Sequence, residues 1–308
     1  MTDAHSDPGG AAGLKSRERS MSGRKSADPF KIEGPALISF SGGRTSGYML
    51  WRILQAHGGT LPDEVHVAFQ NTGKEMPQTL DFIRDCGERW GVEIAWLEFK
   101  LAEHVVDRWQ RVNYETAARD GKPFSDLLSI RKMLPNPTIR FCTADLKIKV
   151  MGAYGRSLGW DEWDNVVGLR ADEPARVARM RGATRDGWSN LMPLAAAGTT
   201  KADVSEFWSR ENFDLMLPNI NGKTALGNCD LCFLKSAATI SAIIRANPES
   251  ANWWIAQEAT PRPSKGGGAT FRSDRPSYAE MAKAVREQRT FDFGTRDELI
   301  DCFCGEAS

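Results

Sequence analysis

The sequence predicts an α/β fold: a Rossmann-like parallel sheet with helices on both faces, followed by a helical C-terminal extension. Short apolar runs typical of strands alternate with helix-like segments through the first hundred residues, which is the pattern of β-α-β units. The first of these runs is almost continuously apolar, as in a strand that is buried on both sides. A glycine-rich turn joins it to the next helix, at the place where open α/β sheets bind ligands.

Each predicted element has a local signal. The first strand leads into the turn Ser41–Ser46, and the helix after this turn ends at the stop signal Gly58-Gly59. Pro77 stands at the first position of the next helix, which proline favours. The predicted strands are 35–40, 64–70, 92–97 and 163–168, and the predicted helices are 47–54, 77–91, 145–158, 202–207, 237–246, 250–257 and 278–287.

The bulk composition is that of an ordinary globular protein. The chain has 308 residues with 40 acidic and 40 basic side chains, so its net charge does not steer it toward nucleic acid or membrane. No apolar run could span a bilayer, and the N-terminus lacks the apolar core of a signal peptide, so we expect a cytoplasmic protein. The expected organisation is a disordered tail (1–33), an α/β domain (34–235) and a helical C-terminal region (236–308) with a flexible loop at 260–276 and a cysteine-containing tail.

The turn Ser41-Gly-Gly-Arg-Thr-Ser46 has the composition of an anion site. Gly42 and Gly43 carry no side chains, so their N–H groups can approach an anion, and the following helix directs its positive end to the same place. Ser41 and Ser46 add hydroxyl donors, and Arg44 adds a permanent positive charge. Two glycines alone would equally fit a tight turn. The strand before, the helix after and the flanking serines favour a phosphate, pyrophosphate or sulfate site.

This turn resembles the SGGxxS PP-loop of the adenine-nucleotide α-hydrolase superfamily and, within it, the phosphoadenosine phosphosulfate (PAPS) reductase family. Three further segments resemble that family and occur in its order: Asn71-Thr-Gly73 with Glu75 and Pro77, Gly168 through Arg176, and Met192-Pro-Leu194 followed by 202–208. Together they cover about Gly34 to Lys235. The resemblance implies a PP-loop nucleotide-binding domain and an enzyme that binds PAPS, adenylyl sulfate or ATP.

Carried over position by position, the resemblance implies a set of nucleotide- or anion-binding residues. They are Ser41, Gly42, Gly43, Arg44, Thr45, Ser46, Asn71, Thr72, Gly73, Gly168, Arg170 and Arg176. Arg170 and Arg176 would clamp anionic oxygens, with a surface salt-bridge network as the alternative. The commonest family loop reads SGGKDS, and Arg44-Thr45 replaces its Lys-Asp here. Because ATP-cleaving relatives use an acidic residue near the loop to place magnesium, Mg²⁺ is expected only if ATP is cleaved.

Six cysteines in a reducing compartment need an explanation other than disulfides. Cys86 shares a predicted helical face with apolar residues and is expected to be an inert core thiol. Cys229-Asp-Leu-Cys232 forms a CxxC, with Cys142 upstream and Cys302-Phe-Cys304 near the C-terminus. A CxxC can be redox-active, metal-binding or accidental. The sequence therefore leaves three possibilities for these cysteines: free thiols, a zinc site or an iron–sulfur cluster.

The resemblance favours the cluster. Family members that reduce adenylyl sulfate hold a [4Fe-4S] cluster with a Cys-Cys pair and a CxxC, but Phe141 here replaces the first cysteine of that pair. The implied ligands are Cys142, Cys229, Cys232 and either Cys304 or Cys302, because a cubane cluster needs four thiolates for full protein ligation. Four thiolates also suit zinc, which stays the alternative metal.

A first functional hypothesis is a sulfonucleotide reductase-like enzyme. The thiolate of Cys302 or Cys304 would attack the sulfate sulfur of the bound nucleotide, with Arg44 as a candidate catalytic cation. A thioredoxin-like thiol reductant would then release sulfite. The family's usual C-terminal Glu-Cys-Gly-Leu-His segment is absent, and Cys304-Gly-Glu is only a faint counterpart.

The second hypothesis is an ATP pyrophosphatase that transfers sulfur from a donor to nucleic acid, as in DNA phosphorothioation or tRNA thiolation. The basic loop 260–276 could contact phosphates and Trp253-Trp254 could stack on bases, although a solvated loop and core packing are the plainer readings. A third hypothesis is a non-catalytic nucleotide-binding module with a structural metal, which the altered loop at Arg44-Thr45 supports. The acceptor and the oligomeric state are not predicted.

Overall fold

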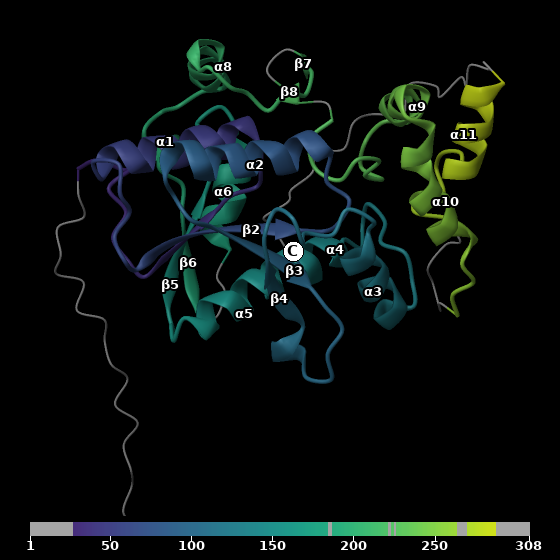
Figure 1. The fold of residues 1–308 in the computed structure, drawn as a ribbon, viewed down its shortest axis with the longest axis horizontal. Helices are drawn as coiled ribbons and strands as arrows, with labels where there is room; N and C mark the ends of the chain where they lie inside the picture. The colour runs from purple at the N-terminus through teal and green to yellow at the C-terminus, as the bar shows by residue number, and fades with distance from the viewer. Residues whose placement is uncertain (1–26, 184–186, 221–222, 225, 264–269, 288–308) are drawn as a thin grey trace, which may run out of the picture.

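A six-stranded mixed sheet forms the centre of the protein, as the computed structural model shows (Figure 1). The structure describes residues 27–183, 187–220, 223–224, 226–263 and 270–287. The strand order is β4-β3-β2-β1-β5-β6, so the chain starts near the middle, builds outward to one edge and then returns to complete the other. All neighbouring strands are parallel except the β3–β4 pair. The predicted α/β class with a parallel sheet is therefore confirmed, with one antiparallel edge strand added.

The first three strands and two helices lie close to their predicted positions. They are β1 (Ala36–Ser39), α1 (Arg44–Ala56), β2 (Val65–Asn71), α2 (Pro77–Trp90) and β3 (Ile94–Phe99). Pro77 occupies the first turn of α2, and Gly91 ends this helix in the left-handed conformation that glycine adopts at low cost. These local signals explain why the boundaries could be placed from sequence.

Helices cover both faces of the sheet. Along β1, Leu37 packs into one hydrophobic cluster and Ile38 into another, because successive side chains in a strand point to opposite sides. Apolar residues of α1 and α2 join the Ile38 cluster, whereas those of α5 (Lys149–Ser157) join the Leu37 cluster. In Figure 1 α1 and α2 accordingly lie above the sheet and α5 below it.

Between β3 and the start of the predicted helix 145–158, no regular structure was predicted. This segment contains the 3-10 turn η1 (Val105–Asp107), the edge strand β4 (Trp109–Val112) and α3 (Lys122–Arg131). One continuous helical stretch then begins with α4 (Phe141–Thr143), passes through a π turn, η2 (Ala144–Ile148), and continues as α5. The expected helix 145–158 is thus real but starts earlier, and it contains a widened turn.

The second half of the chain completes the sheet and adds helices. It contains β5 (Trp163–Val167), α6 (Pro174–Gly182), β6 (Trp188–Leu191), α7 (Pro193–Ala196), α8 (Lys201–Arg210), the short hairpin β7 (Asn219–Ile220) and β8 (Lys223–Thr224), α9 (Ala237–Ala246), η3 (Pro248–Ser250), α10 (Ala251–Ala259) and α11 (Tyr278–Arg286). Residues of α9, α10 and α11 belong to the same hydrophobic cluster as Leu37. The helical C-terminal extension is therefore confirmed, and its core is continuous with the sheet's lower face.

Two expected irregular segments contain packed residues. Phe30 and Ile32, placed in the disordered tail 1–33, are 2% and 3% exposed, because they cover the apolar side of α1. In the loop 260–276, Phe271 is fully buried and lies 5.8 Å from Phe233, centroid to centroid, in a stacked pair. Residues 1–26, the loop residues 264–269 and the tail 288–308 lie outside the described residues.

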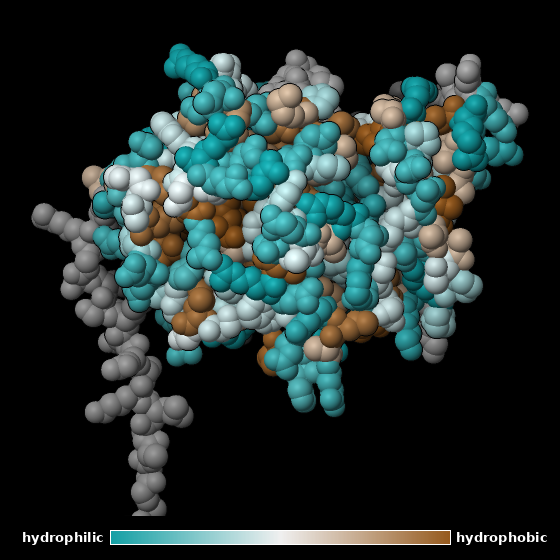
Figure 2. Space-filling model, in the orientation of Figure 1, coloured by the Kyte–Doolittle hydropathy of each residue, from teal (hydrophilic) through white to brown (hydrophobic). Residues whose placement is uncertain are grey.

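The face shown in Figure 2 is hydrophilic over most of its area, with apolar spots between the polar side chains. Large apolar side chains that are at least one-third exposed in the described residues are Leu101, Val105, Val106, Ile130, Ile139 and Met216. None of the helices in the described part of the chain is both long enough and apolar enough to cross a membrane.

Candidate functional site

The glycine-rich turn requires glycine at only one of its two positions. Gly42 has φ +72°, and a Cβ atom there would lie 2.7 Å from Thr79 Cγ2 and 2.8 Å from Ile83 Cδ1. Gly43 has an ordinary φ of −105° and caps α1. A Cβ atom at Gly43 would have only Ser41 Oγ nearby, at 3.8 Å. Gly42 therefore makes the turn possible, whereas Gly43 leaves open space where α1 begins.

The serines organise the loop around the start of α1. Ser46 Oγ accepts the Gly43 N–H at 3.2 Å and the Ser41 hydroxyl at 3.1 Å. The first turn of α1 carries no acidic residue, so no side chain in it opposes the positive end of the helix. This arrangement is suited to an anion, as the sequence predicts.

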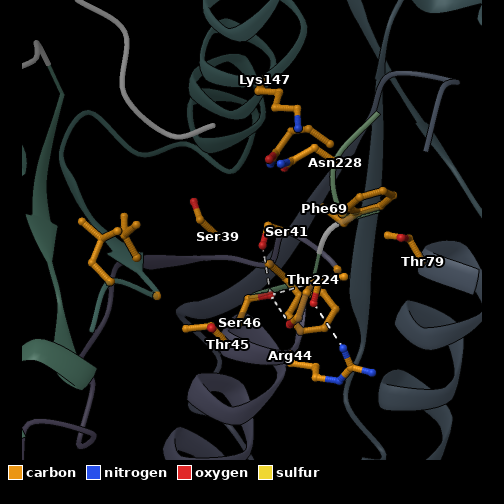
Figure 3. Close-up of a pocket in the computed structure, with 18 of the residues that line it drawn as sticks. Ser39, Ser41, Arg44, Thr45, Ser46, Phe69, Thr79, Lys147, Thr224 and Asn228 are labelled. Atoms are coloured by element: carbon orange, nitrogen blue, oxygen red, sulfur yellow. Dashed lines mark hydrogen bonds between the residues drawn. The ribbon is translucent and has the colours of Figure 1, made fainter. Parts of the chain in front are cut away.

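A cavity of about 390 Å³ opens over this loop (Figure 3). Its size is within the range of small-molecule sites. The ends of β1, β2 and β5 and the segment from Thr224 to Lys235 form its walls. Among the described lining residues, Glu173 carries the single carboxylate, and five carry positive charge: Arg44, Lys147, Arg170, Arg176 and Lys235. A neutral protein thus gathers an excess of positive charge at one cavity.

The side chain of Arg44 does not point at the centre of this cavity (Figure 3). Its guanidinium forms a bidentate ion pair with Asp214, with the Nε–Oδ1 distance 2.6 Å. It also donates to the Leu217 carbonyl at 2.9 Å and to Thr224 Oγ1 at 3.2 Å. The expected role of Arg44 as a catalytic or anion-binding cation is therefore not what its contacts indicate, because Asp214 neutralises its charge.

Arg170 and Arg176 both line the cavity and both belong to an ion-pair network. Glu173 forms ion pairs with both guanidinium groups, and Arg170 also pairs with Asp172 at 2.8 Å. Arg170 Nη1 donates to Thr45 Oγ1 at 3.2 Å, which connects this network to the first turn of α1. Gly168 passes close to the same turn, and a Cβ atom there would lie 3.5 Å from Ser46 Cα. Arg170 and Arg176 thus line the cavity, as the predicted anion clamp requires, and also form the salt-bridge network that was its alternative.

Asn71-Thr-Gly73, expected beside the nucleotide, does not line this cavity. Asn71 is fully buried, and its side-chain amide donates to Glu98 Oε1 at 2.6 Å and to the Ala118 carbonyl at 2.9 Å. Its Oδ1 accepts the Gly73 N–H at 3.0 Å. Thr72 Oγ1 donates to the Glu75 carboxylate and lies 3.4 Å from Cys229 Sγ. In this structure the segment supports the CxxC loop, and its placement beside the nucleotide stays a prediction.

Cys142, Cys229 and Cys232 line a second, small cavity of about 30 Å³. Two segments distant in sequence bring them together: Cys142 lies in α4, and the CxxC lies between β8 and α9. Burial, together with the neighbouring Cys232, raises the pKa of Cys142 to about 12, and burial followed by the charge of Glu75 raises the pKa of Cys229. Cys302 and Cys304 lie outside the described residues. Cys86 is fully buried in the core, as predicted, and burial raises its pKa.

Buried charges hold the CxxC loop in place. Lys74 Nζ pairs with Asp230 Oδ2 at 3.0 Å, and Asp230 Oδ1 accepts the Trp254 indole N–H at 2.8 Å. Lys235, 5% exposed, donates to the carbonyls of Gly227 at 2.5 Å and Cys229 at 2.8 Å. Burial lowers the pKa of Lys235, against the nearby cysteines and Asp230. The loop is therefore fixed by groups that the sequence reasoning did not assign to it.

The basic loop and the tryptophans do not form an exposed nucleic-acid surface in the described residues. The side chain of Arg272 is 3% exposed and pairs with Asp274, and Arg275 donates to the Lys235 carbonyl at 2.6 Å. Trp254 is fully buried, and Trp253 donates its indole N–H to Ser125 at 2.9 Å. These residues stabilise the C-terminal helices, so the core reading of the tryptophans is confirmed.

Sequence reasoning missed several cavity residues. Asn228, Gln70 and Asn165 line the nucleotide-sized cavity, and the buried Gln70 Nε2 has no hydrogen-bond partner in the described residues. Asn165 accepts the Ser39 hydroxyl at 2.8 Å. The available signal was their position, since polar residues at or near the carboxyl end of an apolar strand, such as Gln70, point to the binding edge of a parallel sheet. Lys147 and Asn228 lie across the cavity from Ser41 and Ser46 (Figure 3).

Comparisons with known proteins give one relationship that is close enough to be informative. No family model matches the chain. The solved U34-tRNA thiolase NcsA from Methanococcus maripaludis with its [4Fe-4S] cluster aligns over 87% of this chain and 85% of that chain, but at 13% identity and a TM-score of 0.37, which carries no conclusion. The uncharacterized nin region protein ORF290 of Escherichia phage lambda is 30% identical over 212 residues, or 66% of this chain and 67% of that protein. The chain therefore belongs to the family of the phage lambda nin region protein ORF290.

Proposed function

We propose that the chain is a PP-loop enzyme that binds an adenine nucleotide and carries out sulfur chemistry at a thiol beside it. The observation that carries the proposal is the position of Cys232, which lines both the nucleotide-sized cavity and the cysteine cavity. Lys147, Asn228 and Leu234 also line both. A nucleotide at the loop would thus have a sulfur atom at the margin of its own site.

The cavity over the loop has the chemistry of a nucleotide site. Its positive side chains and the open space at Gly43, where α1 begins, suit phosphate oxygens. Phe40, Phe69 and Leu215 supply apolar surface that a base could contact. Among the described residues that line this cavity, Glu173 carries the single carboxylate, and it is already paired with arginines. This distribution supports an anionic ligand with an aromatic part.

Among the sulfur reactions, the position of the described thiols favours nucleotide-dependent sulfur transfer, and nucleic acid is the class of acceptor that the family resemblance implies. An acceptor oxygen would attack the α-phosphorus of ATP, and pyrophosphate would leave with the bonding electron pair. A sulfur nucleophile supplied by a donor would then attack the activated carbon and displace AMP. The loop would hold the phosphates and position them for both steps. Cys232 would stand where the incoming sulfur is needed.

The expected cluster is only partly matched by the described residues. Three thiols share one cavity, which supplies three of the four ligands of a cubane cluster. However, no group of three Cys, His, Asp or Glu among the described residues is arranged to hold a metal ion. The thiols form a donor set but not a finished metal site, so no step above passes through a metal.

PAPS or adenylyl sulfate reduction is the alternative reaction of the same site. Its nucleophile would be Cys302 or Cys304, which lie outside the described residues, and a thiol reductant would release sulfite. The two reactions leave different products from different nucleotides. Sulfur transfer consumes ATP and yields pyrophosphate and AMP, whereas reduction consumes a sulfonucleotide and yields sulfite.

Nucleotide binding to the anaerobically purified protein tests the proposal first. Isothermal titration with ATP, adenylyl sulfate and PAPS, with GTP as the control, should show binding of at least one adenine nucleotide. Absence of binding for all three at millimolar concentration would refute the nucleotide site. Pyrophosphate release from ATP would then support transfer, and sulfite release would support reduction. Iron, zinc and acid-labile sulfide analysis of the same sample decides whether the three thiols hold a metal.

A further inference from the structure

The guanidinium of Arg44 forms four contacts, all with the segment that follows α8. Asp214 binds it through both carboxylate oxygens, and the Leu217 carbonyl and the Thr224 hydroxyl take further N–H groups. The Arg44 side chain is 10% exposed, and that of Asp214 is 30% exposed. The planar guanidinium of arginine can form two parallel hydrogen bonds to a carboxylate, and the ammonium group of lysine cannot reproduce this geometry. Arg44 therefore joins the loop to a segment about 170 residues away.

The segment joined in this way is a wall of the nucleotide-sized cavity. Leu215 and Thr224 line the cavity directly. Leu215 and Leu217 are 2% and 3% exposed, whereas Met216 between them is 76% exposed with φ +56°. A methionine in the left-handed region costs about 1–2 kcal/mol, so neighbouring contacts must hold the turn in this conformation. Burial opposes ionisation of Asp214, but Arg44 and the backbone N–H groups of Leu215 and Met216 lower the pKa of its carboxyl group.

We propose that Arg44 is a positioning residue of the nucleotide site: it fixes the wall formed by Asp214–Leu217 and Thr224 against the glycine-rich loop and does not bind the phosphates. This inference rests on the proposed nucleotide site. Moving the guanidinium to a phosphate would leave the Asp214 carboxylate without its partner and release the Leu217 carbonyl. The phosphate charges are then left to the other four cations of the cavity and the backbone N–H groups.

Substitution of Asp214 distinguishes the two possible roles of Arg44, because they predict opposite changes in the affinity for ATP. If Arg44 binds phosphate, Asp214→Asn removes a nearby negative charge and releases the guanidinium, so ATP should bind more tightly. If Arg44 positions the wall, the same substitution loosens the wall and ATP should bind about tenfold more weakly. AMP should lose affinity by the same factor, since the wall acts on a part that both ligands share. Arg44→Lys should behave like Asp214→Asn.

Two further measurements make the test independent of folding and of activity. Glu206→Gln changes the net charge by the same amount on exposed α8, away from the cavity, and should leave affinity unchanged. Hydrogen exchange at Leu215–Leu217 should accelerate in Asp214→Asn and Arg44→Lys without any nucleotide present. Tighter ATP binding in Asp214→Asn, or a loss confined to ATP in Arg44→Lys, would overturn the positioning role. If the wild-type protein binds no adenine nucleotide, the proposed function fails, while hydrogen exchange still tests the wall.

Discussion

A carboxylate at Gly43 should abolish nucleotide binding without disturbing the fold. The backbone at this position has φ −105°, which any residue can adopt, and an added Cβ atom would meet only Ser41 Oγ, at 3.8 Å. The side chain of Gly43→Asp would therefore extend into open space over the loop. There it would occupy the place prepared for an anion and bring a negative charge of its own.

The expected magnitude follows from Coulomb's law. Two unit charges about 4 Å apart repel by about 4 kcal/mol at an effective dielectric constant of about 20, the value typical of sites near a protein surface. Each 1.4 kcal/mol corresponds to roughly tenfold in affinity, so ATP binding should weaken by about a thousandfold. Gly43→Ala adds the Cβ atom without the charge and should keep affinity within about threefold. Comparison of Gly43→Asp with Gly43→Ala therefore separates the effect of the added charge from the effect of the added side-chain volume.

Isothermal titration with ATP, accompanied by thermal unfolding, measures both quantities. Gly43→Asp and Gly43→Ala should unfold within a few degrees of the wild-type protein. Gly42→Ala serves as the contrast: it should lower the unfolding temperature, because its φ is +72° and its Cβ atom would overlap Thr79 and Ile83. A folded Gly43→Asp variant that binds ATP like the wild-type protein would refute the placement of the anion at this loop.

Three other predictions concern the charges and thiols around the two cavities. Lys74→Met should lower the free energy of unfolding in urea by about 3–5 kcal/mol, because it leaves Asp230 buried without its cation. The double variant Lys74→Met/Asp230→Leu should recover much of this loss, and additive losses of stability would contradict the argument. Burial opposes ionisation of Asp214, but Arg44 holds the pKa of Asp214 below its ordinary value. The stability from this pair is therefore present above about pH 4 and is lost as pH falls through the lowered pKa. Calorimetric curves of the wild-type protein and Asp214→Asn should differ at about pH 7 and converge as pH falls through the lowered pKa of Asp214. In metal-free native protein, Cys142, with a pKa of about 12, should react with iodoacetamide at pH 8 about a thousandfold more slowly than after unfolding, and equal rates would show that it is not buried.

The regular part of the fold was predictable because its signals are local. Each signal affects only the few residues around it: the apolar run 35–40, the glycine turn after it and Pro77 at the start of α2. The structure has β1, α1 and α2 at the positions that these signals indicate. The helix predicted at 237–246 matches α9, which starts at the Ser236 cap. The prediction that the turn binds an anion also depends on consecutive residues, and it stays a prediction.

What could not be predicted depends on partners far apart in the chain. The charge of Arg44 is neutralised by Asp214, and the Asn71–Gly73 segment packs on the CxxC loop more than 150 residues later. The edge strand β4 pairs antiparallel with β3, and its short, half-exposed sequence gives no strand pattern. Phe30 and Ile32 lie in a polar segment whose composition predicts disorder, yet they cover an apolar helix face. Local composition contains none of this information.

The π turn Ala144–Ile148 has a consequence for the direction of two side chains. In a regular α-helix, residues five apart point about 140° away from each other. Hydrogen bonds to the fifth residue widen the turn and bring such residues close to alignment. Cys142 and Lys147 are five apart, and both line the cysteine cavity. If the same residues were wound as a regular α-helix, Lys147 would point about 140° away from Cys142, so the widened turn is what allows one helix to direct both side chains into the cysteine cavity.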